Sequence, residues 1–368
     1  MPNQIDNDCT ILGGVVQGYG QQQILSLSGS TRLYSGHINA SNLIEIRYSD
    51  DGGVTWTWDT TFSEAAESMN FSMCRSDLDD IFVCFWNTSS GQTKNVFVKK
   101  RDHTAGTWST PLTQVCGVQN VAERLDAMIV FNRNINRLHL IVTIHSYGTG
   151  YLGIYGNYSN DYGTTWIWNG NFSGASVAPA LIYQYTSTSS YPYSCYLWGV
   201  DTSVITGQIF ITWATTYSTQ LYTTRCNADH TANTNLWSYA MGGQGYGGGC
   251  NVTDNVGNNY ACVNFYDYSY AVYRTRVYLN SGTLSLDINW GGTQIVVTGQ
   301  VCIGVDSSNH VYLFYTKVAD GLCYYRYFNG STWGTETALV GVHGSRPSCE
   351  LHSKPSSAYL QVSYISNA

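Results

Sequence analysis

One apolar strand pattern returns along the whole chain and constrains its fold more than any other feature. Each copy is a short run of β-branched and aromatic residues, and the copies lie at 32–38, 80–86, 137–143, 208–213, 259–266, 310–315 and 358–364. Most are about 50 residues apart, which is a period typical of propeller repeats. A short strand and a turn of Asp, Asn, Ser or Gly precede each copy, and further strands follow most of them. Four strands per repeat predict the blades of a β-propeller.

The repeats predict an all-β fold with a single domain over 1–368, a seven-bladed β-propeller of four-stranded antiparallel blades. The blades are expected at 23–65, 66–116, 121–176, 191–241, 248–298, 299–340 and 345–368. The last repeat holds only two strands, and the segment 9–22 precedes the first complete repeat. We therefore expect the N- and C-terminal strands to pair in one blade, which closes the ring and removes an exposed sheet edge.

The composition excludes several classes of protein. With 43% apolar and 14% aromatic residues among 368, the chain can bury a large core, so it is not disordered. Its net charge is -7 and its longest basic run is Lys99-Lys100-Arg101, which argues against a nucleic-acid partner. No apolar stretch is long enough to predict membrane insertion. The N-terminus lacks the features of a signal peptide, which favours either a leader already removed or release by cell lysis.

The eleven cysteines form no CxxC pair, so the sequence predicts neither a zinc site nor a redox motif, and no cofactor. Five of them precede apolar runs at related positions: Cys74, Cys195, Cys250, Cys302 and Cys349. Recurrence at one structural position favours buried thiols, with some disulfides as the alternative.

Two turns after the third strand of a repeat share the pattern Ser-x-Asp-x-Gly-x-Thr-Trp. Their residues are Ser49, Asp51, Gly53, Thr55 and Trp56 in the first repeat, and Ser159, Asp161, Gly163, Thr165 and Trp166 in the third. The carboxylate can accept hydrogen bonds from turn amides, the glycine allows a positive φ, and the tryptophan can pack against the sheet. The turns at 101–108 and 329–333 keep only part of the pattern.

This pattern resembles the Asp box of the sialidase and BNR-repeat β-propellers. The resemblance implies a structural turn on the face opposite the ligand site, so Asp51 and Asp161 are not expected to be catalytic. Sialidases of this family bind a carboxylate with three arginines and use a tyrosine nucleophile assisted by a glutamate, with an aspartate as acid. Their Arg-Ile-Pro motif is absent here, because the first strand reads Gln23-Ile24-Leu25. Arg124 and Arg346 begin inner strands, where they could face a ligand or form surface ion pairs.

A generic glycosidase needs only two carboxylates about 5 to 10 Å apart. The acids expected in the loops that surround the ligand site are Glu64, Glu67, Glu123, Asp126 and Glu350. If the chain is an enzyme, the candidates for catalysis are Glu123, Asp126 and Glu350. The alternative is that they are solvated loop carboxylates. His139 and His145 share one face of a predicted strand, and a packed or hydrogen-bonded pair is favoured over a metal site because no third ligand is identifiable.

Several tyrosines lie in the same set of loops, which are expected to surround the ligand site. The predicted ligand-binding set is Tyr147, Tyr217, Tyr246, Tyr268 and Tyr270, with Arg124 and Arg346. Tyrosine offers a flat apolar face and a hydroxyl with little side-chain entropy to lose on binding. The alternative is that tyrosine is merely abundant, since the chain contains 30.

These features favour a non-catalytic recognition or structural protein, not an enzyme, located outside cells or on a virion surface. Its expected partners are glycans or surface proteins, and other virion proteins if it is a surface or tail component for host attachment. The alternative is a glycoside hydrolase of sialidase-like fold without the arginine clamp. A cytosolic interaction platform is a third reading, because propellers host binding, catalysis and scaffolding alike.

Overall fold

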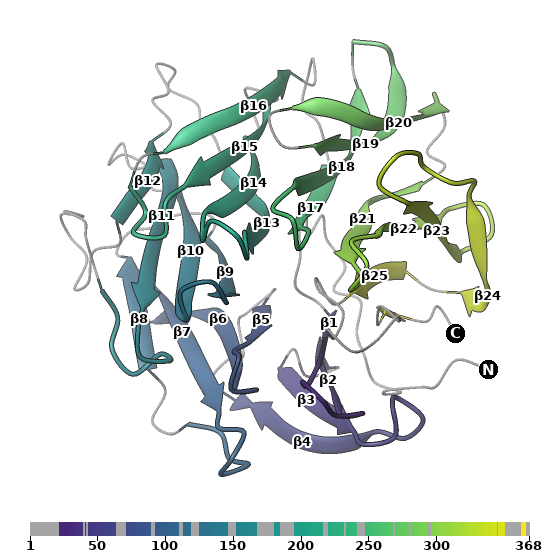
Figure 1. The fold of residues 1–368 in the computed structure, drawn as a ribbon. Coiled ribbons are helices and arrows are strands. Elements are labelled where there is room, and N and C mark those ends of the chain that lie inside the picture. Colours follow the sequence, from purple (N-terminus) through teal and green to yellow (C-terminus); the bar gives the residue numbers. More distant parts are fainter. Residues whose placement is uncertain are drawn as a thin grey trace.

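The chain folds into antiparallel sheets arranged around a central axis, as a β-propeller (Figure 1). The computed structural model describes residues 22–39, 41, 43–63, 71–89, 93–109, 113–118, 125–145, 152–167, 180–184, 195–215, 220–231, 233–240, 247–267, 269–279, 282–292, 296–343, 345–349 and 362–365. Within these ranges there are six four-stranded sheets and one two-stranded sheet.

Each complete blade is a meander of four strands in chain order from the axis outward. Blade 1 contains β1 (Gln22–Ser26), β2 (Leu33–Ile38), β3 (Ile44–Ser49) and β4 (Thr57–Phe62). Blade 2 contains β5 (Phe71–Arg75), β6 (Ile81–Ser89), β7 (Thr93–Arg101) and β8 (Thr113–Val118). Blade 3 contains β9 (Leu125–Asn132), β10 (Arg137–His145), β11 (Leu152–Ser159) and β12 (Ala180–Gln184).

The second half of the chain repeats this arrangement. Blade 4 contains β13 (Cys195–Thr202), β14 (Ile209–Thr215), β15 (Gln220–Cys226) and β16 (Thr234–Ala240). Blade 5 contains β17 (Gly247–Thr253), β18 (Asn259–Asp267), β19 (Val272–Leu279) and β20 (Thr283–Gly291). Blade 6 contains β21 (Val296–Val305), β22 (Val311–Lys317), β23 (Leu322–Phe328) and β24 (Thr337–His343), and the two-stranded sheet contains β25 (Ser345–Cys349) and β26 (Val362–Ile365).

The predicted β-propeller with four-stranded antiparallel blades is confirmed, but the predicted number of blades is corrected. Six complete blades are described rather than seven, because the last repeat contributes only β25 and β26. This small sheet contacts β21 on one side and β1 on the other. The segment 9–22 lies outside the described residues except for Gln22, so the pairing of the two terminal strands stays a prediction.

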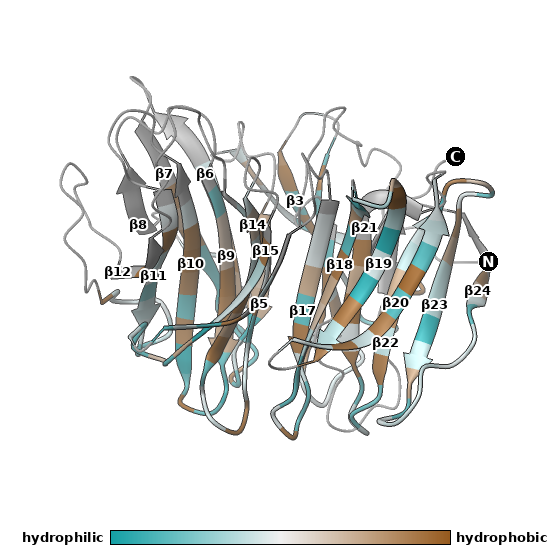
Figure 2. Ribbon diagram, turned by 90° about the horizontal axis from the view of Figure 1, so that it is seen from above, coloured by the Kyte–Doolittle hydropathy of each residue, from teal (hydrophilic) through white to brown (hydrophobic). Residues whose placement is uncertain are grey.

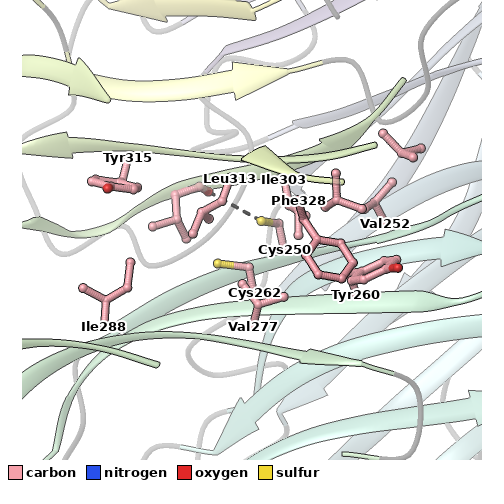
Figure 3. Packing of buried hydrophobic residues seen from close by; sticks show 13 residues of the cluster. Cys250, Val252, Tyr260, Cys262, Val277, Ile288, Ile303, Leu313, Tyr315 and Phe328 are labelled. Carbon is pink, nitrogen blue, oxygen red and sulfur yellow. Dashed lines mark hydrogen bonds between the residues drawn. The ribbon is translucent and has the colours of Figure 1, made fainter. Parts of the chain in front are cut away.

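The core consists of apolar layers between neighbouring blades. The second strands β2 and β14 are buried at every position, because a blade covers each of their faces. Outer strands such as β20 are partly exposed. Figure 3 shows the layer between blades 5 and 6, where Cys250 and Cys262 pack with Ile303, Leu313 and Phe328. The seven cysteines whose side chains are described are all buried and form no disulfide, as expected of Cys74, Cys250 and Cys302. The side chains of Cys195 and Cys349 are not among those described.

A side chain on the inner strand of each of blades 1 to 5 also forms a hydrogen bond with the backbone of the next blade. Four of these side chains accept from an amide and the fifth, a thiol, donates to a carbonyl. The pairs are Gln23 with Met73 (2.5 Å), Ser72 with Ile129 (3.2 Å), Asp126 with Leu197 (3.2 Å), Asp201 with Thr253 (2.5 Å) and Cys250 with Val301 (3.7 Å). These bonds fix neighbouring inner strands relative to one another.

In the described residues, no helix is long and apolar enough to cross a membrane.

Candidate functional site

The two ends of the propeller differ in the connections that they carry. Turns from first to second strand and from third to fourth strand lie at one end, which we call the turn end, along the lower edge of Figure 2. The loops from second to third strand and the connections between blades lie at the opposite end, which we call the loop rim. A ligand site on the loop rim would be surrounded by several blades at once.

Both Ser-x-Asp-x-Gly-x-Thr-Trp turns lie at the turn end. In the first, Asp51 Oδ1 accepts hydrogen bonds from the amides of Val54 (2.9 Å) and Thr55 (2.8 Å) and from the Ser49 hydroxyl (2.7 Å). These bonds, chiefly those from Thr55, hold the pKa of Asp51 well below its usual range. The Trp56 indole donates to the carbonyl of Gly53, whose φ of 96° is the positive value that the pattern predicts.

The turn of blade 3 repeats these bonds. Asp161 accepts from the Thr165 amide (2.8 Å) and the Ser159 hydroxyl (2.8 Å), and the Trp166 indole donates to the Gly163 carbonyl (3.2 Å). The carboxylates therefore organise the turns and do not face the loop rim. Membership of the Asp-box family stays a prediction.

Most residues predicted for the rim lie outside the described part of the chain. These are Glu64, Glu67, Glu123, Arg124, Tyr147, Tyr217, Tyr246, Tyr268 and Glu350. Arg346 lies on β25. Asp126 is buried, at 3% exposure, and its Oδ2 accepts the Leu197 amide, so it connects blades 3 and 4. Tyr270 is the predicted ligand residue whose surroundings are described.

Tyr270 lies in the loop between β18 and β19 and is 66% exposed. The guanidinium of Arg274 lies 5.3 Å from the centre of its ring. Arg274 is held in turn by two carboxylates, with Nε 3.2 Å from Asp267 Oδ2 and Nη1 donating to Asp287 Oδ2 at 2.9 Å. Arg276 also binds Asp287 Oδ2, at 3.1 Å. We call these five residues the Tyr270 platform.

Local strand geometry explains the platform. Alternate residues of a strand point to the same side, so Arg274 and Arg276 share one face of β19. Asp287 on β20 lies opposite Arg276 in the register, within reach of both guanidinium groups. Asp267 ends β18 and is fully buried. The Arg-x-Arg spacing in a predicted strand was a signal for this arrangement that the sequence-based search of the rim missed.

A second group of aromatic and charged side chains lies between blades 5 and 6. Glu336 binds the Lys317 ammonium and accepts a hydrogen bond from the Tyr315 hydroxyl. The ammonium lies 4.2 Å from the centre of the Tyr324 ring and 6.0 Å from that of Trp290. Burial, and then the bond to Glu336, raise the pKa of Tyr315, so its hydroxyl stays protonated and remains a donor.

Blade 1 also contributes a carboxylate near the rim. Glu45 is nearly buried, and its Oε1 accepts from Arg47 Nε at 2.7 Å. Its Oε2 accepts from the Asn39 side-chain amide at 3.3 Å. The sequence analysis did not select Glu45, because a single acid in a strand gives no local signal.

The predicted pairing of His139 with His145 is wrong. The two positions are six residues apart on β10, about 20 Å along an extended strand, too far for contact. His139 instead meets His230 of blade 4, with Nδ1 and Nε2 3.0 Å apart, toward the turn end. Among the side chains that the structure describes, no group of three or more His, Cys, Asp or Glu could hold a metal ion.

No family model matches the chain, and no curated protein matches it in sequence. Solved structures do match its fold. An ulvan lyase of polysaccharide lyase family PL25 has a TM-score of 0.57 at 10% identity, with 100% of this chain and 96% of the lyase covered. A second structure of that type, bound to -[GlcA(1-4)Rha3S]-, has a TM-score of 0.56 at 10% identity, with 95% and 94% covered. An α-L-arabinofuranosidase from Fusarium graminearum has a TM-score of 0.51 at 9% identity, with 82% and 90% covered.

These similarities show a shared β-propeller fold. A microbial sialidase also matches, but its TM-score of 0.45 at 10% identity is too low to support an argument. The expectation that the chain is not an enzyme is contradicted, because the structures similar to it over most of their length include carbohydrate-active enzymes. Nothing in the fold or in these similarities supports the predicted virion or host-attachment role.

Proposed function

We propose that the protein is a polysaccharide-cleaving enzyme that binds its glycan across the loop rim. The observation that carries the proposal is the Tyr270 platform, an exposed aromatic ring supported by an ordered ion-pair network on that rim. The similar solved structures supply the second support, since the fold that they share with this chain occurs in a polysaccharide lyase and in an α-L-arabinofuranosidase.

An exposed tyrosine suits a sugar ring because the apolar face of a pyranose can stack on it. Exposed aromatic side chains normally lose rotamer freedom on binding, which opposes affinity. At Tyr270 the guanidinium of Arg274 already contacts the ring, and Arg274 is itself fixed by Asp267 and Asp287. A ring that is ordered before the ligand arrives binds at a lower entropic cost.

The catalytic groups are proposed among the acids that begin or follow inner strands, Glu123 and Glu350, as the sequence analysis suggested for an enzyme. Asp126 is not included, because its carboxylate bonds to the backbone of blade 4. Glycans outside cells are the proposed substrates.

The test is depolymerisation of a panel of soluble polysaccharides by the purified chain, followed by size-exclusion chromatography and by assay of new reducing ends. Shortening of at least one polymer, with a raised KM in Tyr270→Ala, is expected. Trp58→Ala is the matched control, since Trp58 is also an exposed aromatic side chain, at 56%, but lies next to the turn end. Absence of shortening across neutral, uronate-containing and sulfated polymers would refute the proposal.

A further inference from the structure

We infer that the sugar unit bound at the Tyr270 platform is uncharged, and that the protein cleaves a neutral polysaccharide by hydrolysis rather than a uronate polymer by elimination. This inference rests on the proposed function and specifies its substrate class. It separates the protein from the ulvan lyase, whose structure contains a glucuronate unit.

The first argument is that basic side chains near the loop rim already have carboxylate partners within the chain. Several of the basic side chains described there are bonded to carboxylates of the chain. Arg274 and Arg276 bind Asp287, and Lys317 binds Glu336. A sugar carboxylate would have to compete with a partner that is already in place.

The second argument is the burial of one of these partners. Asp267 is fully buried next to Arg274 Nε. Drawing Arg274 toward a ligand carboxylate would separate the buried Asp267 carboxylate from the guanidinium next to it, which is unfavourable. Asp287, which binds both arginines, would also face the ligand carboxylate as a like charge. The platform therefore disfavours an anionic ring.

The same groups suit a neutral ring. The side chain of Asp287 is 26% exposed, so it can accept hydrogen bonds from sugar hydroxyls while both arginines remain bound to it. Tyr270 presents its face for stacking. Neither interaction requires an ion pair to break.

The chemistry of cleavage follows from the substrate. Elimination removes a proton from C5 of a uronate, which requires a group that neutralises the carboxylate next to that carbon. A neutral sugar has no such carboxylate, so this elimination is not open to it, and the inferred reaction is hydrolysis of its glycosidic bond. The C–O bond breaks, the leaving oxygen gains a proton, and the oxygen of water bonds to the anomeric carbon while its second proton is released.

The experiment compares neutral arabinan and galactan with polygalacturonate and ulvan, in water enriched in oxygen-18. Hydrolysis places the heavy oxygen at the new reducing end, whereas elimination places none there and creates a conjugated uronate that absorbs ultraviolet light. We expect labelled products from a neutral polymer only. Unsaturated products from a uronate polymer would overturn the inference while leaving the proposed function intact.

A charge variant tests the platform itself. Asp287→Asn removes one negative charge and leaves the arginines less neutralised, so binding of a uronate oligosaccharide, measured by calorimetry, should strengthen several-fold. Binding of a neutral oligosaccharide should stay unchanged or weaken. Wild-type protein that binds the uronate oligosaccharide more tightly than the neutral one, and loses that preference in Tyr270→Ala, would refute the inference. If no oligosaccharide binds and no polymer is shortened, the proposed function fails as well.

Discussion

Acid should weaken the contact between blades 3 and 4, because His139 and His230 meet there without access to solvent. The two rings are 0% and 2% exposed, and their facing nitrogens are 3.0 Å apart. Arg137 and Tyr158 lie beside them on blade 3, and Asp229 precedes His230 on blade 4. Burial lowers the pKa of both histidines, and for His139 the neighbouring His230 and Arg137 lower it further.

The size of the stability loss follows from the difference in the pKa of His230 between the folded and the unfolded chain. Burial lowers the pKa of His230 from 6.5 to about 4, so the unfolded chain binds a proton at a pH where the folded chain does not. Stability is therefore intact above neutral pH and is lost progressively as the pH falls from 6.5 toward 4. The full difference corresponds to about 3 kcal/mol, of which about 2 kcal/mol is lost by about pH 5. Asp51 titrates below this window, because its pKa is lowered.

The assay is urea unfolding at about pH 7.5 and about pH 5, followed by tryptophan fluorescence. The double variant His139→Gln/His230→Gln should lose less stability between these conditions than the wild type. His103→Gln is the control, because His103 is exposed and lies in blade 2, outside the contact between blades 3 and 4. An equal loss in wild type and double variant would refute the reasoning. If the double variant does not fold, imidazole NMR signals of the wild type that titrate at 6.5 for every histidine would refute it instead.

Three further predictions concern packing and hydrogen bonds. Gly156→Ala should destabilise the fold by about 1 to 3 kcal/mol, because an added Cβ would lie 2.6 Å from the buried His230 ring of blade 4. Gly292→Ala is the control: the atom nearest to its added Cβ is 3.5 Å away, so it should have little effect in the same urea titration. The Cys84 thiol should resist Ellman's reagent until the chain unfolds, because it is buried and burial raises its pKa to about 12, and rapid labelling of native protein at this residue would contradict the packing. Asp126→Ala should lower the free energy of unfolding by about 1 to 3 kcal/mol, because it leaves the Leu197 amide without its acceptor. Its kcat/KM should be unchanged well below the unfolding temperature. A large loss of kcat with unchanged stability would show that this carboxylate is catalytic.

Strand periodicity and turn residues were enough to predict a propeller of four-stranded blades. Both features are local, since alternation and Gly/Asn/Asp turns act within a few residues of each other. The Ser-x-Asp-x-Gly-x-Thr-Trp turns are the clearest case, because every bond of Asp51 and Asp161 is made within the turn itself. The predicted count of seven blades was wrong for the described residues, because the last repeat contributes only two strands to the described sheets.

The partners of side chains across blades could not be predicted in the same way. The sequence places His139 on one face of a strand, but only the packing of blade 4 against blade 3 brings His230 to it. It also presents Asp126 as an acid of the rim and a candidate for catalysis, whereas the tertiary structure places it against the backbone of the next blade. Asp267, Arg274 and Asp287 come from three strands of one blade, and their register makes them a single network. Local patterns therefore determined the elements and their order, while long-range packing decided which polar groups are structural and which remain open to a ligand.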